Sequence, residues 1–222
     1  MFACTLAWRS PKTFLPRMNT PASSTDGNSA VAIRCVALLQ DLGVTHVVTV
    51  PDNTSALILT ALDRTAVASA GMPGGEGTIR LLYATREGEA MGLASGLWLG
   101  GAQPVVLIQN TGLLESGDGL RGTASRMGAP ILLLITCRGY AKARGAGVDP
   151  SQAEVDRDVL VRNDLDSVAH MTEVTLRAWG IPFRYLRDSS DLTPIAEALS
   201  QAQEDQRPVA VLLDTSFEGL GS

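Results

Sequence analysis

Hydrophobic positions follow two alternating periods from Ser29 onward. Short runs of Val, Ile and Leu, typical of buried strands, are separated by segments with apolar residues three or four positions apart, as on one face of a helix. The pattern predicts strands at 44–50, 79–84, 105–109, 131–136, 183–186 and 209–213. It predicts helices at 29–42, 54–64, 87–99, within 113–127, at 166–179 and at 192–203.

This alternation of strands and helices is typical of an α/β fold with a parallel sheet. The strands are apolar on both faces, which indicates that helices cover both sides of the sheet. We therefore predict a single flavodoxin-like domain over residues 29–217, with a six-stranded parallel sheet covered by helices on both faces. Residues 1–28 contain prolines and a polar run without either period, so we expect them to form a disordered leader.

Two segments interrupt the alternation. One is the Gly-rich insert at 70–78, and the other is the polar stretch at 138–165. The second is longer than the usual limit of about 12–15 residues for a loop without regular structure. We therefore expect it to be a functional, interfacial or disordered loop.

The composition of the 222 residues argues against several classes of protein. No apolar run approaches the roughly 20 residues that cross a bilayer, and the net charge of -5, with scattered basic residues, is unlike that of a nucleic-acid binder. The 3 cysteines are far apart and odd in number, which fits reduced thiols in the cytoplasm. With 2 histidines and no Cys-x-x-Cys pair, no metal site is expected in this chain.

Polar residues follow the ends of the predicted strands, where parallel sheets bind their ligands. Asp52, Glu87, Asn110 and Arg138 come shortly after the first four strands. Such residues also serve as helix caps and turn formers in any α/β protein, so position alone does not decide between the two roles. Glu87 stands out because it begins a segment rich in Gly and Ala, whose small side chains let another group approach closely.

Three segments resemble the pyrimidine-binding domain of thiamine-diphosphate decarboxylases. They are TREGEAMGLASG at 85–96, GGAQP at 100–104 and QNTGL at 109–113. The similarity extends over about residues 30–215 and is strongest to the family of sulfopyruvate decarboxylase α subunits and phosphonopyruvate decarboxylases. Pro51-Asp52 and Cys137-Arg138-Gly139 fall where this family carries a Pro-Asp turn and a Trp-Arg-Gly segment, so Cys137 is a departure.

This resemblance implies roles for the polar residues at the strand ends. Glu87 aligns with the glutamate that hydrogen-bonds the pyrimidine ring of thiamine diphosphate and takes part in the proton relay. Related decarboxylases often place histidines at the third-strand turn, and none stands there in this chain. The catalytic residues implied are Glu87, Asp52 and Asn110. The cofactor-binding residues implied are Glu87, Pro51, Thr85 and Gln109.

The resemblance also implies a partner chain. Thiamine-diphosphate enzymes bind Mg²⁺ and the diphosphate through Gly-Asp-Gly followed by paired asparagines. Here Gly117-Asp118-Gly119 is not followed by Asn-Asn, so we interpret the match as accidental. We therefore expect a β subunit with a diphosphate-binding domain to hold the Mg²⁺, and the enzyme to be active only as a hetero-oligomer of the two chains.

The activity that the resemblance implies is decarboxylation of a 2-oxoacid with a second anionic group, such as sulfopyruvate or phosphonopyruvate. Arg138 is the first candidate to bind that anion, because a guanidinium matches the oxygens of sulfonate, phosphonate or carboxylate. It also opens the polar segment 138–165, which could close over the site. Two alternatives stay open: a carboligating subunit with the same cofactor, and a non-catalytic flavodoxin-like binding module.

Overall fold

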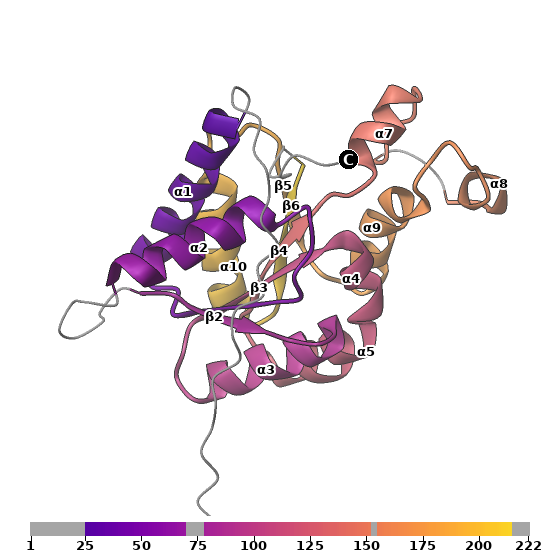
Figure 1. Ribbon diagram of the computed structural model, residues 1–222. Helices are drawn as coiled ribbons and strands as arrows, with labels where there is room; N and C mark the ends of the chain where they lie inside the picture. The colour runs from indigo at the N-terminus through magenta and orange to yellow at the C-terminus, as the bar shows by residue number, and fades with distance from the viewer. Residues whose placement is uncertain (1–24, 70–77, 152–154, 215–222) are drawn as a thin grey trace, which may run out of the picture.

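The computed structural model describes residues 25–69, 78–151 and 155–214 (Figure 1). The expected leader up to residue 24 and nearly all of the Gly-rich insert lie outside the described residues. The first helix begins at Thr25 rather than at Ser29, so residues 25–28 belong to the helix and not to a leader.

The described residues form six strands, and each connection between successive strands contains at least one helix. The strands are β1 (His46–Thr49), β2 (Arg80–Tyr83), β3 (Pro104–Gln109), β4 (Leu132–Thr136), β5 (Phe183–Leu186) and β6 (Val209–Leu213). The longer helices are α1 (Thr25–Asp41), α2 (Ala56–Ser69), α3 (Glu87–Leu99), α9 (Ser167–Ala178) and α10 (Thr193–Asp205). The short helical segments are α4 (Asn110–Glu115), α5 (Gly117–Gly119), the π-helical turn η1 (Leu120–Ala124), α6 (Ser125–Met127), α7 (Tyr140–Gly145) and α8 (Arg157–Leu160).

The strands form one sheet in the order β2-β1-β3-β4-β6-β5, and every pair of neighbours is parallel. All five residues of β4 and all five of β6 are buried, as expected for strands covered on both faces. The predicted α/β class with six parallel strands is therefore confirmed.

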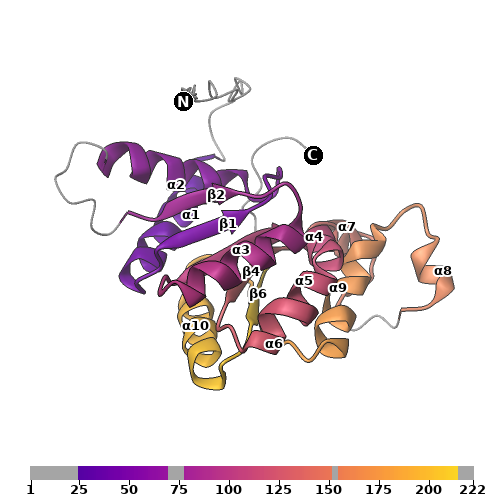
Figure 2. The same cartoon turned by 90° about the horizontal axis from the view of Figure 1, so that it is seen from below.

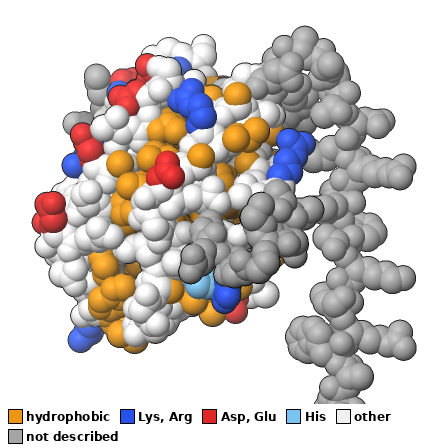
Figure 3. Space-filling model, turned by 90° about the vertical axis from the view of Figure 1, so that its left-hand side faces the viewer, with side chains coloured by type: hydrophobic (Ala, Val, Ile, Leu, Met, Phe, Trp, Pro, Cys, Tyr) orange, Lys and Arg blue, Asp and Glu red, His pale blue; other side chains and the backbone are white. Residues whose placement is uncertain are grey.

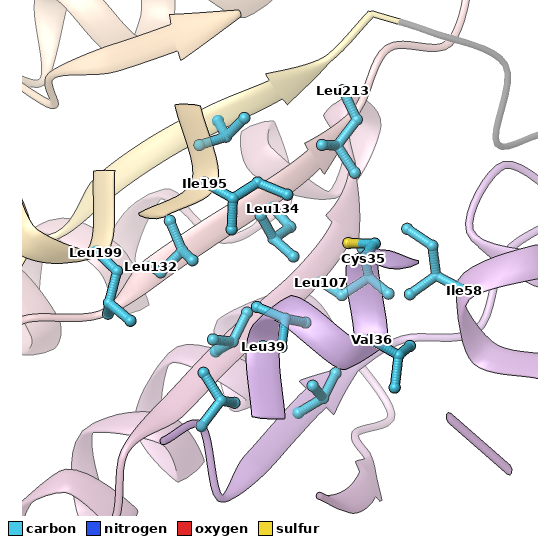
Figure 4. Packing of buried hydrophobic residues seen from close by; sticks show 14 of the residues in the cluster. Cys35, Val36, Leu39, Ile58, Leu107, Leu132, Leu134, Ile195, Leu199 and Leu213 are labelled. Carbon is cyan, nitrogen blue, oxygen red and sulfur yellow. The ribbon is translucent and has the colours of Figure 1, made fainter. Parts of the chain in front are cut away.

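Helices cover both faces of this sheet (Figures 1 and 2). On one face α1, α2 and α10 pack through residues such as Cys35, Leu39 and Ile58 against Leu132 and Leu134 (Figure 4). On the other face, α3, the α4–α6 segment and α9 pack against alternate residues of the same strands. Each fully buried Leu or Ile contributes about 1.5–3 kcal/mol to folding, so the two apolar layers fix the sheet and the edge that carries the polar loops.

Two segments differ from the expected elements. The single helix expected within 113–127 is a chain of short helical pieces, in which Gly117, Gly119 and Gly122 lower the helix propensity and the π-helical turn η1 intervenes. The polar stretch 138–165 is not one long loop, because it contains α7 and α8. Tyr140 and Ala143 of α7 are buried, which ties this part of the stretch to the core.

His170 of α9 lies inside the protein. Its side chain is fully buried, and neither ring nitrogen has a hydrogen-bond partner among the described residues. Burial, together with the positive charge of Arg162, lowers the pKa of His170. The imidazole is therefore neutral near pH 7 and fills the core as a packing group.

The surface shows no concentration of one charge on the face formed by the left-hand side of Figure 1. There, charged side chains stand apart from one another among apolar and neutral groups (Figure 3). Within the three described stretches, no helix combines the length and hydropathy that crossing a membrane requires.

Candidate active site

The reversal of strand order in the sheet marks the place where a ligand site is expected. From β1 the chain moves to β2 on one side and then to β3 on the other side of β1. In open parallel sheets the loops at such a switch point diverge and leave a crevice beyond the carboxyl ends of the strands. Asp52 and Glu87 follow β1 and β2, and Gln109 is the last residue of β3, so the topology brings these three predicted residues to one edge.

Glu87 is the first residue of α3, and its half-buried side chain lies directly on the backbone of Gly112 in α4. A Cβ atom added at Gly112 would come within 2.5 Å of Glu87 Cγ and 2.7 Å of its Cδ. The carboxylate therefore needs glycine at this position. Among the described residues the Glu87 carboxylate has no hydrogen-bond or ion-pair partner, which leaves it available to a ligand.

Glu89, two residues further on, is committed to its own helix terminus. Its Oε2 accepts hydrogen bonds from the Thr85 backbone N–H at 2.8 Å and from the Thr85 hydroxyl at 2.7 Å. These bonds from Thr85 lower the pKa of Glu89. Glu89 thus stabilises the start of α3, whereas Glu87 does not take part in this capping.

Glu115, the last residue of α4, is also fully paired. Its Oε2 accepts the Gly88 backbone N–H at 2.7 Å, and its Oε1 accepts Arg86 Nε at 2.7 Å and Arg86 Nη2 at 2.5 Å. Burial alone would raise the pKa of Glu115, but the Gly88 N–H and the Arg86 guanidinium hold that pKa below its usual value. Sequence analysis did not select Glu115, because its partners come from a distant segment.

Asp52 binds the turn that precedes α2. Its Oδ1 accepts the backbone N–H groups of Thr54 at 2.7 Å and Ser55 at 3.0 Å, as well as the Thr54 hydroxyl at 2.5 Å. Its Oδ2 accepts the Ser55 hydroxyl at 2.9 Å. In this conformation the carboxylate acts as a turn and capping group, and its catalytic role stays a prediction.

Thr54 connects this turn to the neighbouring strand ends. Its hydroxyl lies 2.5 Å from the hydroxyl of Thr136 at the end of β4, and Gln109 Nε2 donates to it at 3.3 Å. The Thr111 hydroxyl in turn donates to Gln109 Oε1 at 2.6 Å. A polar network therefore runs along the carboxyl edge from β1 through β3 to β4. Sequence analysis included Gln109 in the site but missed the threonines.

Asn110 lies in the interior of the protein. It is fully buried, and its Nδ2 donates to the Arg138 carbonyl at 2.9 Å and to the Thr172 hydroxyl at 3.1 Å. Its Oδ1 is buried without a partner among the described residues. These contacts join α4 to α9 in this conformation, and the catalytic role of Asn110 stays a prediction.

Arg138 lies at the surface after β4, with 55% of its side chain exposed. Its Nε forms an ion pair with Asp166 Oδ2 at 2.9 Å, and Asp166 also caps α9. The anion-binding role expected for Arg138 therefore competes with an intramolecular carboxylate. Pro51 and Thr85, the two further residues predicted to line the cofactor, are exposed at the same edge of the sheet.

The Gly117-Asp118-Gly119 sequence has a packing role. A Cβ at Gly117 would lie 2.9 Å from the Trp179 ring, and one at Gly119 would lie 2.6 Å from the Gly88 carbonyl oxygen. Asp118 is exposed and pairs with Arg121 at 2.6 Å. Both glycines therefore permit close approach of neighbouring elements, and the described residues contain no group of three or more metal-ligating side chains.

A separate cleft of about 580 Å³ lies further along the same carboxyl edge, where β5 and β6 end. Asp214 binds both Arg144, at 2.7 Å, and Arg187, at 3.3 Å. Asp149 supplies a second carboxylate to the same cleft. The two positive charges are thus matched by two negative ones, and the cleft gives no preference for an anionic ligand.

Comparison with known proteins finds similarity to one kind of enzyme subunit. No protein-family model matches the chain. Sulfopyruvate decarboxylase subunit alpha of Methanococcus maripaludis is 26% identical over 139 residues, which cover 63% of this chain and 74% of that protein. The same subunit of Methanothermobacter thermautotrophicus is 26% identical over 180 residues, covering 81% and 92% respectively. The chain resembles sulfopyruvate decarboxylase subunit alpha. The similarity predicted from the motifs at 85–113 is therefore confirmed.

A solved structure of 2-oxoglutarate:ferredoxin oxidoreductase from Magnetococcus marinus also aligns with the fold, with a TM-score of 0.48 and 17% sequence identity. The aligned region covers 86% of this chain but only 29% of that chain.

Proposed function

We propose that this chain is the pyrimidine-binding subunit of a thiamine-diphosphate-dependent 2-oxoacid decarboxylase. The observation that carries the proposal is Glu87, a half-buried carboxylate at the carboxyl edge of the sheet without a partner among the described residues. Its neighbours Glu89 and Glu115 are both paired. Sequence similarity to two proteins named sulfopyruvate decarboxylase subunit alpha supports the reaction class.

The residues at this edge suit the pyrimidine half of the cofactor. The glycine beneath Glu87 leaves the carboxylate accessible, and the side chains of Gln109 and Thr111 supply an amide and a hydroxyl close by. Thiamine diphosphate, when bound, supplies the electron sink for decarboxylation of a 2-oxoacid. Glu87 would hold or share a proton with the pyrimidine ring, and Gln109 and Pro51 would border that ring.

The substrate that we propose is a 2-oxoacid with a second anionic group, bound in part by Arg138. The Arg138 guanidinium pairs with Asp166 through Nε, and 55% of the Arg138 side chain remains exposed. In Arg138→Ala we expect kcat/KM for sulfopyruvate to fall about 10- to 100-fold, because a hydrogen-bonded charged contact is lost, while pyruvate turnover changes little. Steady-state kinetics with both substrates test this. An equal decrease for both would assign Arg138 to the structure of the loop.

The proposed partner is a β subunit that binds Mg²⁺ and the diphosphate. We expect the purified chain to release no CO₂ from 2-oxoacids in the presence of Mg²⁺ and thiamine diphosphate. The complex isolated from the native host through a tag on this chain should do so, and adding the separated partner to the chain should restore turnover. Turnover by the isolated chain at the rate of the complex would refute the need for a partner.

A further inference from the structure

The start of α3 has an unusual capping arrangement. Arg86, at the N-cap position, makes no side-chain hydrogen bond to the helix. The free N–H groups of a first helical turn need acceptors, and a capping side chain normally supplies one. Here a carboxylate from another element does so, since Glu115 of α4 accepts the Gly88 N–H at 2.7 Å.

Two further contacts restrict the same turn. Arg86 binds the other oxygen of Glu115, which fixes the carboxylate in orientation. Gly119 packs closely against the first turn of α3. A Cβ atom at Gly119 would lie 2.6 Å from the Gly88 carbonyl oxygen, so a larger residue would not fit there. The backbone of Glu87 and Gly88 is thus held from α4 on one side and from α5 on another.

From these contacts we infer that Glu115 is a positioning residue for Glu87. Glu115 caps α3 across the two elements, and this contact sets the place of the Glu87 backbone and hence of the carboxylate above Gly112. The inference on catalysis rests on the proposed role of Glu87. The inference on helix capping stands on the hydrogen bonds alone.

The charge arrangement favours this assignment over a simple surface ion pair. Arg86 is 69% exposed, and exposed ion pairs contribute little on their own. The Gly88 N–H belongs to the positive end of a 13-residue helix, where a carboxylate is favoured by both the hydrogen bond and the helix dipole. We therefore expect the cap to matter more than the arginine contact.

The first part of the test measures backbone protection in the isolated full chain, where no cofactor or partner is needed. In Glu115→Ala, amide hydrogen exchange at Gly88 should become about 10-fold faster, because the acceptor is lost. Arg86→Ala should change it much less. The matched control Asp118→Asn breaks the nearby Arg121 ion pair without touching α3 and should leave exchange unchanged. Unchanged exchange in Glu115→Ala would overturn the capping assignment.

The second part measures kinetics in the assembled complex. Glu115→Ala should lower kcat about 10- to 100-fold with little change in KM for the 2-oxoacid, because misplacement of a catalytic group reduces turnover more than binding. Glu115→Gln keeps an acceptor oxygen and should recover part of both losses; it also serves if the alanine variant does not fold. Faster exchange with wild-type kcat would overturn the positioning role. Wild-type kcat in Glu87→Gln would instead refute the proposed function and leave the capping result intact.

Discussion

Glu87→Gln should lower kcat of the assembled complex by about 100- to 10,000-fold while the chain keeps its fold. The large effect is expected because an amide cannot exchange a proton with the cofactor as a carboxylate does. The small structural effect is expected because a carboxylate in the first turn of a helix contributes only about 0.3–1 kcal/mol. Steady-state kinetics and thermal unfolding of the same preparation measure the two effects separately.

Glu89→Gln is the matched control for this prediction. Glu89 lies in the same helical turn and carries the same charge, but its carboxylate binds Thr85 rather than facing a ligand. A glutamine keeps an acceptor for Thr85, so the variant should retain most of the activity. The thiamine assignment of the site would be wrong if Glu87→Gln turned over at the wild-type rate, or if both variants lost activity equally.

Gly112→Ala should produce a comparable loss of activity without removing any polar group. The added methyl would occupy the space of Glu87 Cγ and Cδ, so the carboxylate must leave its position. The stability change is the balance of two opposing effects. Overpacking costs about 1–3 kcal/mol, whereas replacing glycine within a helix gains up to about 1 kcal/mol. We therefore expect a modest decrease in melting temperature and a decrease in kcat of about 100-fold.

Gly145→Ala controls for the substitution itself. Gly145 also belongs to a short helix, as its last residue, but a Cβ there meets no atom within 4 Å. This variant should keep both its stability and its activity. Wild-type kcat in Gly112→Ala would show that turnover does not depend on the position of the Glu87 carboxylate against Gly112. The described geometry of the site would then not be the functional one.

The sequence alone was sufficient to predict the fold class and to choose the edge of the sheet for the proposed site. Strand periodicity is a local property, and the apolar runs at 131–136 and 209–213 became fully buried strands of the parallel sheet. A parallel sheet brings all its carboxyl ends to one edge, so residues that follow successive strands meet there. Glu87 could be singled out before the structure because it combines that position with a Gly-rich helix and a family motif.

The partners of each side chain, in contrast, were decided only by the tertiary structure. Asn110 and Glu87 both follow strand ends, yet one is buried between α4 and α9 while the other is available to a ligand. Glu115 is 27 positions from Gly88 in the sequence, and no local pattern signals that it caps α3. Helix and strand periods report which face of an element is buried. Hydrogen bonds between distant segments depend on how those elements pack, and this packing is fixed only when the two apolar layers close around the sheet.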